Sequence, residues 1–195
     1  MFLSVLNVLW LMGVAAGLGI FGLFPATFAL FKLFGQQELF ETQSPIKPIF
    51  KAFWLHYRAC FLKANGIGLV YAAVLFSIGI DKNIVQLYEP WGSVLLVPLN
   101  LLSIYVLLTL AFLIPIDIHT EGSTREKMKL ALLAPVLMPK ASALIVLVGI
   151  GSVILADVFA AGIFLFYVSL AILLLNKICL KSMYQKSVIV ERALA

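Results

Sequence analysis

Charge is what this sequence has least of. Only 12% of its 195 residues are Asp, Glu, Lys or Arg, and 63% are hydrophobic. A soluble domain is about a quarter charged and about half apolar. The composition therefore excludes an ordinary soluble domain and predicts an all-α membrane protein that crosses the bilayer several times.

Signatures of catalysis and metal binding are also scarce. There are two cysteines and two histidines, and His56 and His119 lie in separate segments without ligands at metal-binding spacing. We find no glycine-rich phosphate loop and no Walker-type lysine. We expect no disulfide between Cys60 and Cys179, since both fall near predicted cytoplasmic ends. The sequence predicts no metal, no cofactor, no direct nucleotide binding and no enzymatic activity.

The first 31 residues contain no Lys or Arg. A secretory signal peptide begins with a positively charged region, so this pattern favours a first membrane span. The formal net charge is +5. We attribute this excess to basic residues that mark the cytoplasmic side of a membrane protein. We expect no binding of nucleic acid.

The stretch from Gly17 to Phe34 combines helix-weakening residues with an aromatic stripe. Its glycines weaken a helix, and Pro25 removes a backbone donor. We expect the first span to bend or break near Gly22 and Pro25. Unpaired backbone groups inside lipid must be covered by protein, so this stretch is predicted to be a packing site for the other spans. The short helix that follows the break carries aromatic residues at helical spacing: Phe24, Phe28 and Phe31.

Five transmembrane helices are predicted within a single membrane domain. A short polar loop, 81–91, separates the second from the third. Ser123 and Glu126 match a capping box, so a cytoplasmic helix is predicted over 124–138, and the tail 177–195 reads as an amphipathic extension of the last span. The spans are 2–24, 64–80, 92–116, 140–156 and 158–176.

An interfacial helix is predicted over 49–63. Its aromatic residues share one helical face, and basic residues flank that face, which is typical of a helix lying in the membrane interface. The residues on this face are Phe50, Phe53, Trp54, Tyr57 and Phe61.

Asp157 is the only charge between Ala141 and Asn176. This run is too long for one span of about 20 residues, and an acid at mid-bilayer would cost about 3 kcal/mol. We therefore place Asp157 in a tight external turn between the fourth and fifth spans. A buried functional carboxylate is the alternative.

The basic residues orient the chain. Of 14 Lys and Arg, 13 lie on one predicted side, and only Lys82 lies on the other. By the positive-inside rule, the N-terminus is outside and the C-terminus is in the cytoplasm.

Three stretches resemble the YesL-like family of small bacterial integral membrane proteins: Leu6–Trp10, Gly22–Phe31 and Pro48–Asn65. Asp117 and the region 127–139 are similar in outline. The family usually has a His-Pro pair before the fourth span, where this chain has Met138-Pro139. The resemblance implies a multi-pass protein of the bacterial cytoplasmic membrane that accompanies a carbohydrate importer of the ATP-binding-cassette (ABC) type.

The hypothesis that follows is a non-enzymatic accessory or regulatory subunit that contacts the permease subunits of such an importer. The small residues Gly13 and Gly17 would allow close helix contact. The alternative is a stand-alone or homo-oligomeric transporter or channel, with Asn100, Tyr105 and Asn176 along a polar path. A membrane enzyme ranks third. The candidate partner-binding residues are Gly13, Gly17, Phe24, Pro25, Phe28, Trp54, Tyr57, Arg58, Pro135 and Pro139.

Overall fold

The computed structural model describes residues 2–36, 46–88, 92–158 and 167–194, and the secondary structure in these ranges is entirely helical. The predicted all-α class is thereby confirmed. The helices are α1 (Phe2–Ala16), α2 (Ile20–Gly35), α4 (Ile46–Gln86), α5 (Gly92–His119), α6 (Thr124–Leu137), α7 (Pro139–Val158) and α9 (Val168–Leu194).

The N-terminal segment forms a helical hairpin. The predicted break near Gly22 and Pro25 is wrong in its position: the chain turns between α1 and α2, where Leu18 has φ 55° and Gly19 has φ 83°. Only glycine adopts positive φ at little cost, and such a residue ends a helix. Pro25 lies inside α2, where it removes one hydrogen bond. The predicted span 2–24 is thus two short helices packed against each other.

Close packing holds this hairpin together. A Cβ on Gly22 would lie 2.4 Å from the carbonyl oxygen of Val14, so the two backbones are in contact there. The indole nitrogen of Trp10 donates to the hydroxyl of Thr27 across the pair at 3.1 Å. α2 also packs against α4, α5 and α9, which agrees with its predicted role as a packing site.

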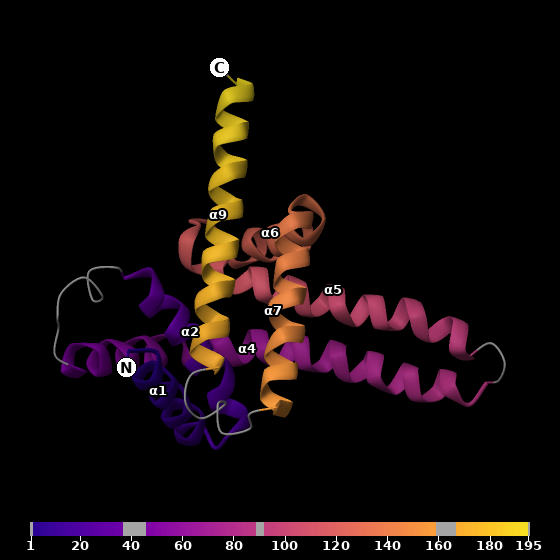
Figure 1. Cartoon of the computed structure of the whole chain (residues 1–195), viewed down its shortest axis with the longest axis horizontal. Coiled ribbons are helices and arrows are strands. Elements are labelled where there is room, and N and C mark those ends of the chain that lie inside the picture. Colours follow the sequence, from indigo (N-terminus) through magenta and orange to yellow (C-terminus); the bar gives the residue numbers. More distant parts are fainter. Residues whose placement is uncertain (1, 37–45, 89–91, 159–166, 195) are drawn as a thin grey trace.

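One helix of 41 residues, α4, takes the place of three predicted segments. It runs through the predicted interfacial helix 49–63, the span 64–80 and the first part of the predicted loop 81–91. The segment contains no proline after Pro48. An isolated glycine costs only about 1 kcal/mol in a helix, so nothing in this sequence stops the helix before Gln86. α4 and α5 pair as a long hairpin, whose outer half projects as an arm (Figure 1).

The aromatic face of α4 packs mainly inside the chain. Phe53 and Tyr57 are buried, and a Cβ on Gly13 would lie 3.0 Å from the Phe53 ring. The Tyr57 hydroxyl donates to the carbonyl oxygen of Gly13 at 2.9 Å. The interfacial interpretation is therefore wrong for these two side chains. Phe50, Trp54 and Phe61 remain wholly or partly at the surface.

The predicted capping box begins α6. The Glu126 N–H donates to the Ser123 hydroxyl oxygen at 3.3 Å, and the Ser123 N–H donates to the Glu126 carboxylate at 3.0 Å. α6 ends within one residue of its predicted limit and meets α7 at a bend of 90°. Pro139 is the first residue of α7, a position that suits proline.

α9 joins the end of the fifth predicted span and the tail in one helix. Asp157 is exposed in the last turn of α7. The turn predicted around Asp157 and the start of the fifth span extend into 159–166, outside the described residues.

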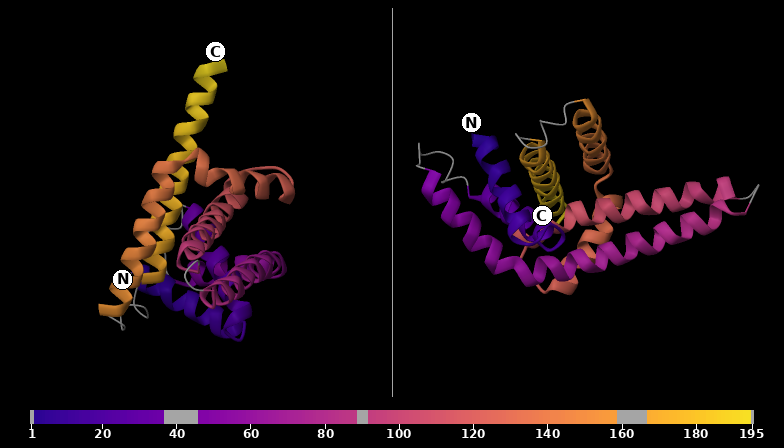
Figure 2. Two further views of the ribbon diagram at one scale, coloured as in Figure 1. Left: turned by 90° about the vertical axis from the view of Figure 1, so that its right-hand side faces the viewer. Right: turned by 90° about the horizontal axis from the view of Figure 1, so that it is seen from below.

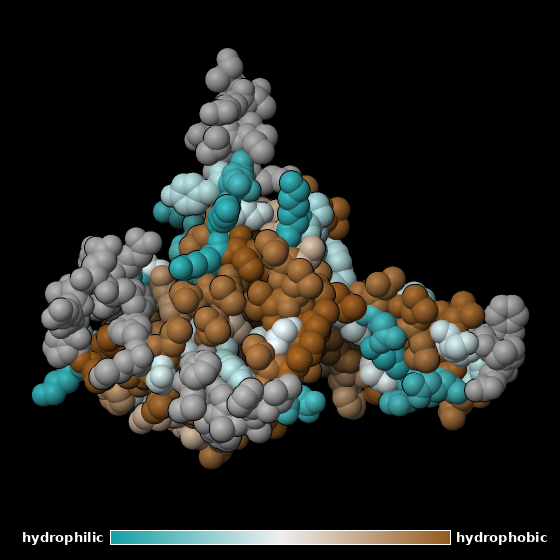
Figure 3. Space-filling view, viewed as in Figure 1, coloured by the Kyte–Doolittle hydropathy of each residue, from teal (hydrophilic) through white to brown (hydrophobic). Residues whose placement is uncertain are grey.

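The helices do not form one parallel bundle. α7 and α9 lie side by side and cross the α4–α5 hairpin steeply, while α1 and α2 lie at the end opposite the arm (Figures 1 and 2). Apolar residues dominate the face around α7, and the arm carries apolar residues with a polar patch among them, as Figure 3 shows. By length and composition α4 and α5 can each cross a membrane, and the bent pair α6–α7 is a third candidate. The described residues therefore form an all-helical membrane protein with two or three candidate spans.

Candidate functional site

A charged junction ties three helices together at the inner end of the arm. Asp117 lies in the last turn of α5, and its carboxylate accepts two hydrogen bonds from Lys63 of α4, at 2.6 and 2.7 Å. Lys127 of α6 lies 3.5 Å from the same carboxylate and donates to the backbone oxygen of Asp117 at 2.9 Å. The Asp117 side chain is 7% exposed, against 14% for Lys127 and 43% for Lys63. Cations at a helix C-terminus also favour the helix dipole.

Burial shifts the pKa of two groups on α4, His56 and Cys60, toward the neutral form. Burial, with the nearby charge of Lys32, lowers the pKa of His56 from its usual 6.5. Among the described residues its Nε2 atom has no hydrogen-bond partner. Burial raises the pKa of the Cys60 thiol, which makes it a poor nucleophile. Within the described ranges no three His, Cys, Asp or Glu side chains come close enough to hold a metal ion.

An apolar groove lies where α7 crosses α5, with a volume of about 460 Å³. Gly149 lies on its α7 wall, and a Cβ placed on Gly149 would meet no atom within 4 Å. The absence of a side chain there leaves the α7 backbone open to close approach by another helix. The groove is lined by Ile104, Leu107, Leu108, Ile145, Val146, Gly149, Ile150, Val153 and Ile154.

Most of the sequence-predicted contact residues are occupied by the chain itself. Gly17 packs against Gly22, at a place where a Cβ would lie 2.2 Å from the Gly22 Cα. The Phe24 ring similarly fills the space above Gly68. Trp54 is half-buried and Arg58 is exposed on α4. Pro139 is exposed at the start of α7, and the buried members of the set are Gly13, Gly17, Pro25, Phe28, Tyr57 and Pro135.

The groove residues were not singled out by the sequence analysis. They belong to strongly apolar segments, and no polar residue is among those that line the groove. The open glycine in the middle of α7, Gly149, was the one available signal.

The three polar residues of the transporter alternative lie in different environments. Asn100 is exposed on α5, whereas the Tyr105 hydroxyl donates to the backbone oxygen of Leu132 on α6. Asn176 is buried on α9.

A family model described as a protein of unknown function, DUF624, matches residues 3–82. These residues contain α1, α2 and all but the last turn of α4. The match therefore covers the hairpin and the long helix that packs against it.

Three proteins of Bacillus subtilis (strain 168), each described as uncharacterised, are similar to this chain. YteU is 29% identical over 130 residues, which are 67% of this chain and 57% of YteU. YesL is 28% identical over 181 residues, which are 92% of this chain and 84% of YesL. YesV is 28% identical over 168 residues, which are 83% of this chain and 76% of YesV.

No solved structure matches the chain. The family match begins in α1, and the alignment with YesL covers nearly the whole chain. Together they confirm the resemblance noted from the sequence: this chain is similar to YesL, YteU and YesV.

Proposed function

We propose that this protein is a non-enzymatic accessory or regulatory membrane subunit of an ABC carbohydrate importer. In this proposal a transmembrane helix of a permease subunit lies in the groove between α5 and α7. The observation that carries the proposal is the groove itself, which is apolar and has an open glycine on its wall.

The shape of the groove favours a helix as its occupant. Apolar surface alone drives little association in lipid, because lipid tails are equally apolar. Helices associate where small residues let their backbones approach, and Gly149 supplies such a place on α7. The aliphatic side chains on both sides of Gly149 would pack against the visiting helix. The link to carbohydrate import is taken from the YesL-like resemblance.

A matched pair of variants tests the groove. Gly149→Leu fills it, whereas Gly66→Leu adds the same side chain on α4, at a glycine whose Cβ also meets no atom within 4 Å. We expect permease subunits of an ABC carbohydrate importer to co-purify with the wild type and with Gly66→Leu in mild detergent, and to be lost from Gly149→Leu.

Equal recovery of permease subunits with both variants would show that the groove is not the contact surface. If the wild-type protein purifies without any permease subunit, the proposed function is refuted. Sugar flux through the purified protein alone in liposomes would support the transporter alternative instead.

The proposal includes five membrane spans with the N-terminus outside and the C-terminus in the cytoplasm. The arm supports a span at this place, since α4 has no charged residue over 64–80. That segment is about 26 Å long, close to the roughly 30 Å thickness of the hydrocarbon core. Lys63 and Asp117 lie at one end of it and Lys82 lies beyond the other.

Labelling of introduced cysteines tests the orientation. A membrane-impermeant reagent added outside cells is expected to label Lys82→Cys and to leave Lys51→Cys unlabelled until the membrane is opened. External labelling of Lys51→Cys would refute the assignment. The native cysteines, Cys60 and Cys179, are buried.

A further inference from the structure

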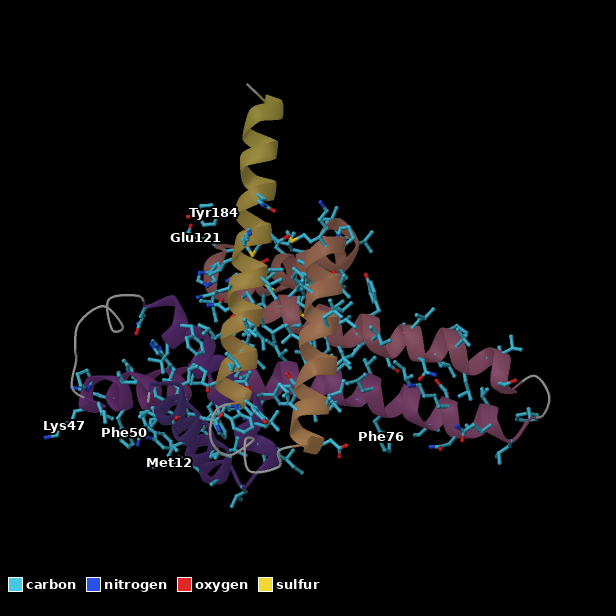
Figure 4. All side chains as sticks on the ribbon, in the orientation of Figure 1. Met12, Lys47, Phe50, Phe76, Glu121 and Tyr184 are labelled. Atoms are coloured by element: carbon cyan, nitrogen blue, oxygen red, sulfur yellow. The ribbon has the colours of Figure 1, made fainter. Side chains whose placement is uncertain are left out.

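The first half of α4 carries a second concave surface, away from the groove and independent of the proposed function. It is a pocket of about 600 Å³ lined by Phe50, Lys51, Trp54, Leu55 and Arg58. These residues lie on one helical face, because residues three or four apart are neighbours on a helix. Figure 4 shows Phe50 near the start of α4, at the end of the molecule opposite the arm. We call this pocket, with the five residues that line it, the α4 surface.

The aromatic wall of the α4 surface is fixed to the core. The Trp54 ring meets the edges of Phe53 and Tyr57, with ring centroids 5.7 and 5.2 Å apart. Phe50 packs against Trp54 at 6.2 Å. The Tyr57 hydroxyl in turn is bonded to the α1 backbone at Gly13. The wall is therefore held in place by contacts within the chain.

Within the described residues, the cations of the α4 surface have no acidic partner. Lys51 and Arg58 are exposed, and neither forms an ion pair with any residue the structure describes. Lys63 differs from them, because Asp117 pairs with it. α4 has no acidic residue before Asp81. Lys51 and Arg58 are seven residues apart, so they lie on one face about 10 Å apart along the helix axis.

The same surface presents exposed apolar side chains between its cations. Leu55 is 67% exposed and Phe50 is 42% exposed. A ligand that fits must therefore offer negative charge to Lys51 and Arg58 and hydrocarbon to Leu55 and Trp54. A phospholipid with an anionic headgroup combines both in one molecule. Basic residues next to aromatic side chains are also typical of the membrane interface.

We propose that the α4 surface binds an anionic phospholipid. The headgroup phosphate lies between Lys51 and Arg58, and the glycerol and upper acyl chains lie against Trp54 and Leu55. An acidic protein segment would satisfy the cations but would leave Leu55 and Phe50 without apolar contact.

The test measures lipid retained by the purified protein after reconstitution with equal amounts of phosphatidylglycerol and phosphatidylcholine. Lys51→Gln with Arg58→Gln removes the two cations of the pocket. Arg125→Gln with Lys129→Gln removes two exposed cations of α6, so both variants change the net charge equally. Each basic residue near a membrane contributes about a fivefold preference for anionic lipid. We expect the phosphatidylglycerol preference to fall by about 25-fold in the pocket variant and by less than about twofold in the control.

An equal fall in both variants would show general charge attraction and overturn the proposal, as would a wild type without phosphatidylglycerol preference. Leu55→Ser separates a lipid from a free anion, because it leaves every charge in place. We expect it to lower phosphatidylglycerol retention, and unchanged retention would count against the acyl contact. Displacement of the lipid by inorganic phosphate alone would show a phosphate site and refute the lipid assignment.

Discussion

Replacing Asp117 with Asn is expected to loosen the junction that joins α4, α5 and α6. The substitution keeps the shape of the side chain and removes its charge. Lys63 is partly exposed and can return its ammonium group to water, whereas Lys127 is largely buried and would keep only its bond to the Asp117 backbone. Most of the cost should therefore come from Lys127.

The magnitude follows from these two environments. An exposed ion pair contributes up to about 1 kcal/mol, and leaving one partner of a buried pair uncompensated costs about 3–5 kcal/mol. The Lys127 contact is long, at 3.5 Å, and that lysine keeps its backbone bond. We therefore expect about 2 kcal/mol in total, below the buried-pair range. For a chain of this size that corresponds to a fall in Tm of about 4–8 °C.

The buried thiols of Cys60 and Cys179 provide the assay. A dye that fluoresces on reaction with thiols reports their exposure as the purified protein unfolds in detergent. Asp81→Asn is the matched control, since Asp81 is exposed at the far end of α4 and forms no ion pair with a described residue. A fall in Tm of under 1 °C for Asp117→Asn, or an equal fall for Asp81→Asn, would refute the reasoning.

Three further perturbations test the packing described above. Because the folded pKa of His56 is lowered, the unfolded chain binds more protons, so stability should fall as the pH drops below 6.5; thermal unfolding of His56→Gln between pH 7.5 and 5.5 should show a smaller fall than the wild type. Tyr57→Phe removes the bond to Gly13 and should cost about 1 kcal/mol, measured as a lower Tm; an unchanged Tm would mean that this bond contributes nothing. Gly22→Ala places a methyl group 2.4 Å from the Val14 oxygen and should abolish tight packing of α1 on α2, whereas Gly66→Ala should leave stability unchanged or raised; equal Tm values for the two would contradict the close approach seen here.

Local signals predicted the helices that have local causes. The capping box at Ser123 correctly predicted the first residue of α6, because a cap depends on side chains within one turn. The run of apolar residues after Pro139 gave α7 in the same way.

Features set by distant contacts were harder to predict. Pro25 stands out in the sequence, yet the hairpin turns at Leu18 and Gly19, where packing of Gly22 on Val14 decides the geometry. The aromatic face of α4 matched an interfacial helix equally well, and only its contact with Gly13 shows that it is core. The groove depends on how α7 crosses α5, which no pattern within either segment records.

The length of α4 has a mechanical consequence. Its 41 residues make a rod of about 62 Å, and the junction with Asp117 holds it at Lys63, near its midpoint. Because the first half of α4 packs against α1 and α2, the second half extends from it as a lever supported at one end. A small bend of α4 near Lys63 would therefore become a larger sideways displacement at the tip of the arm.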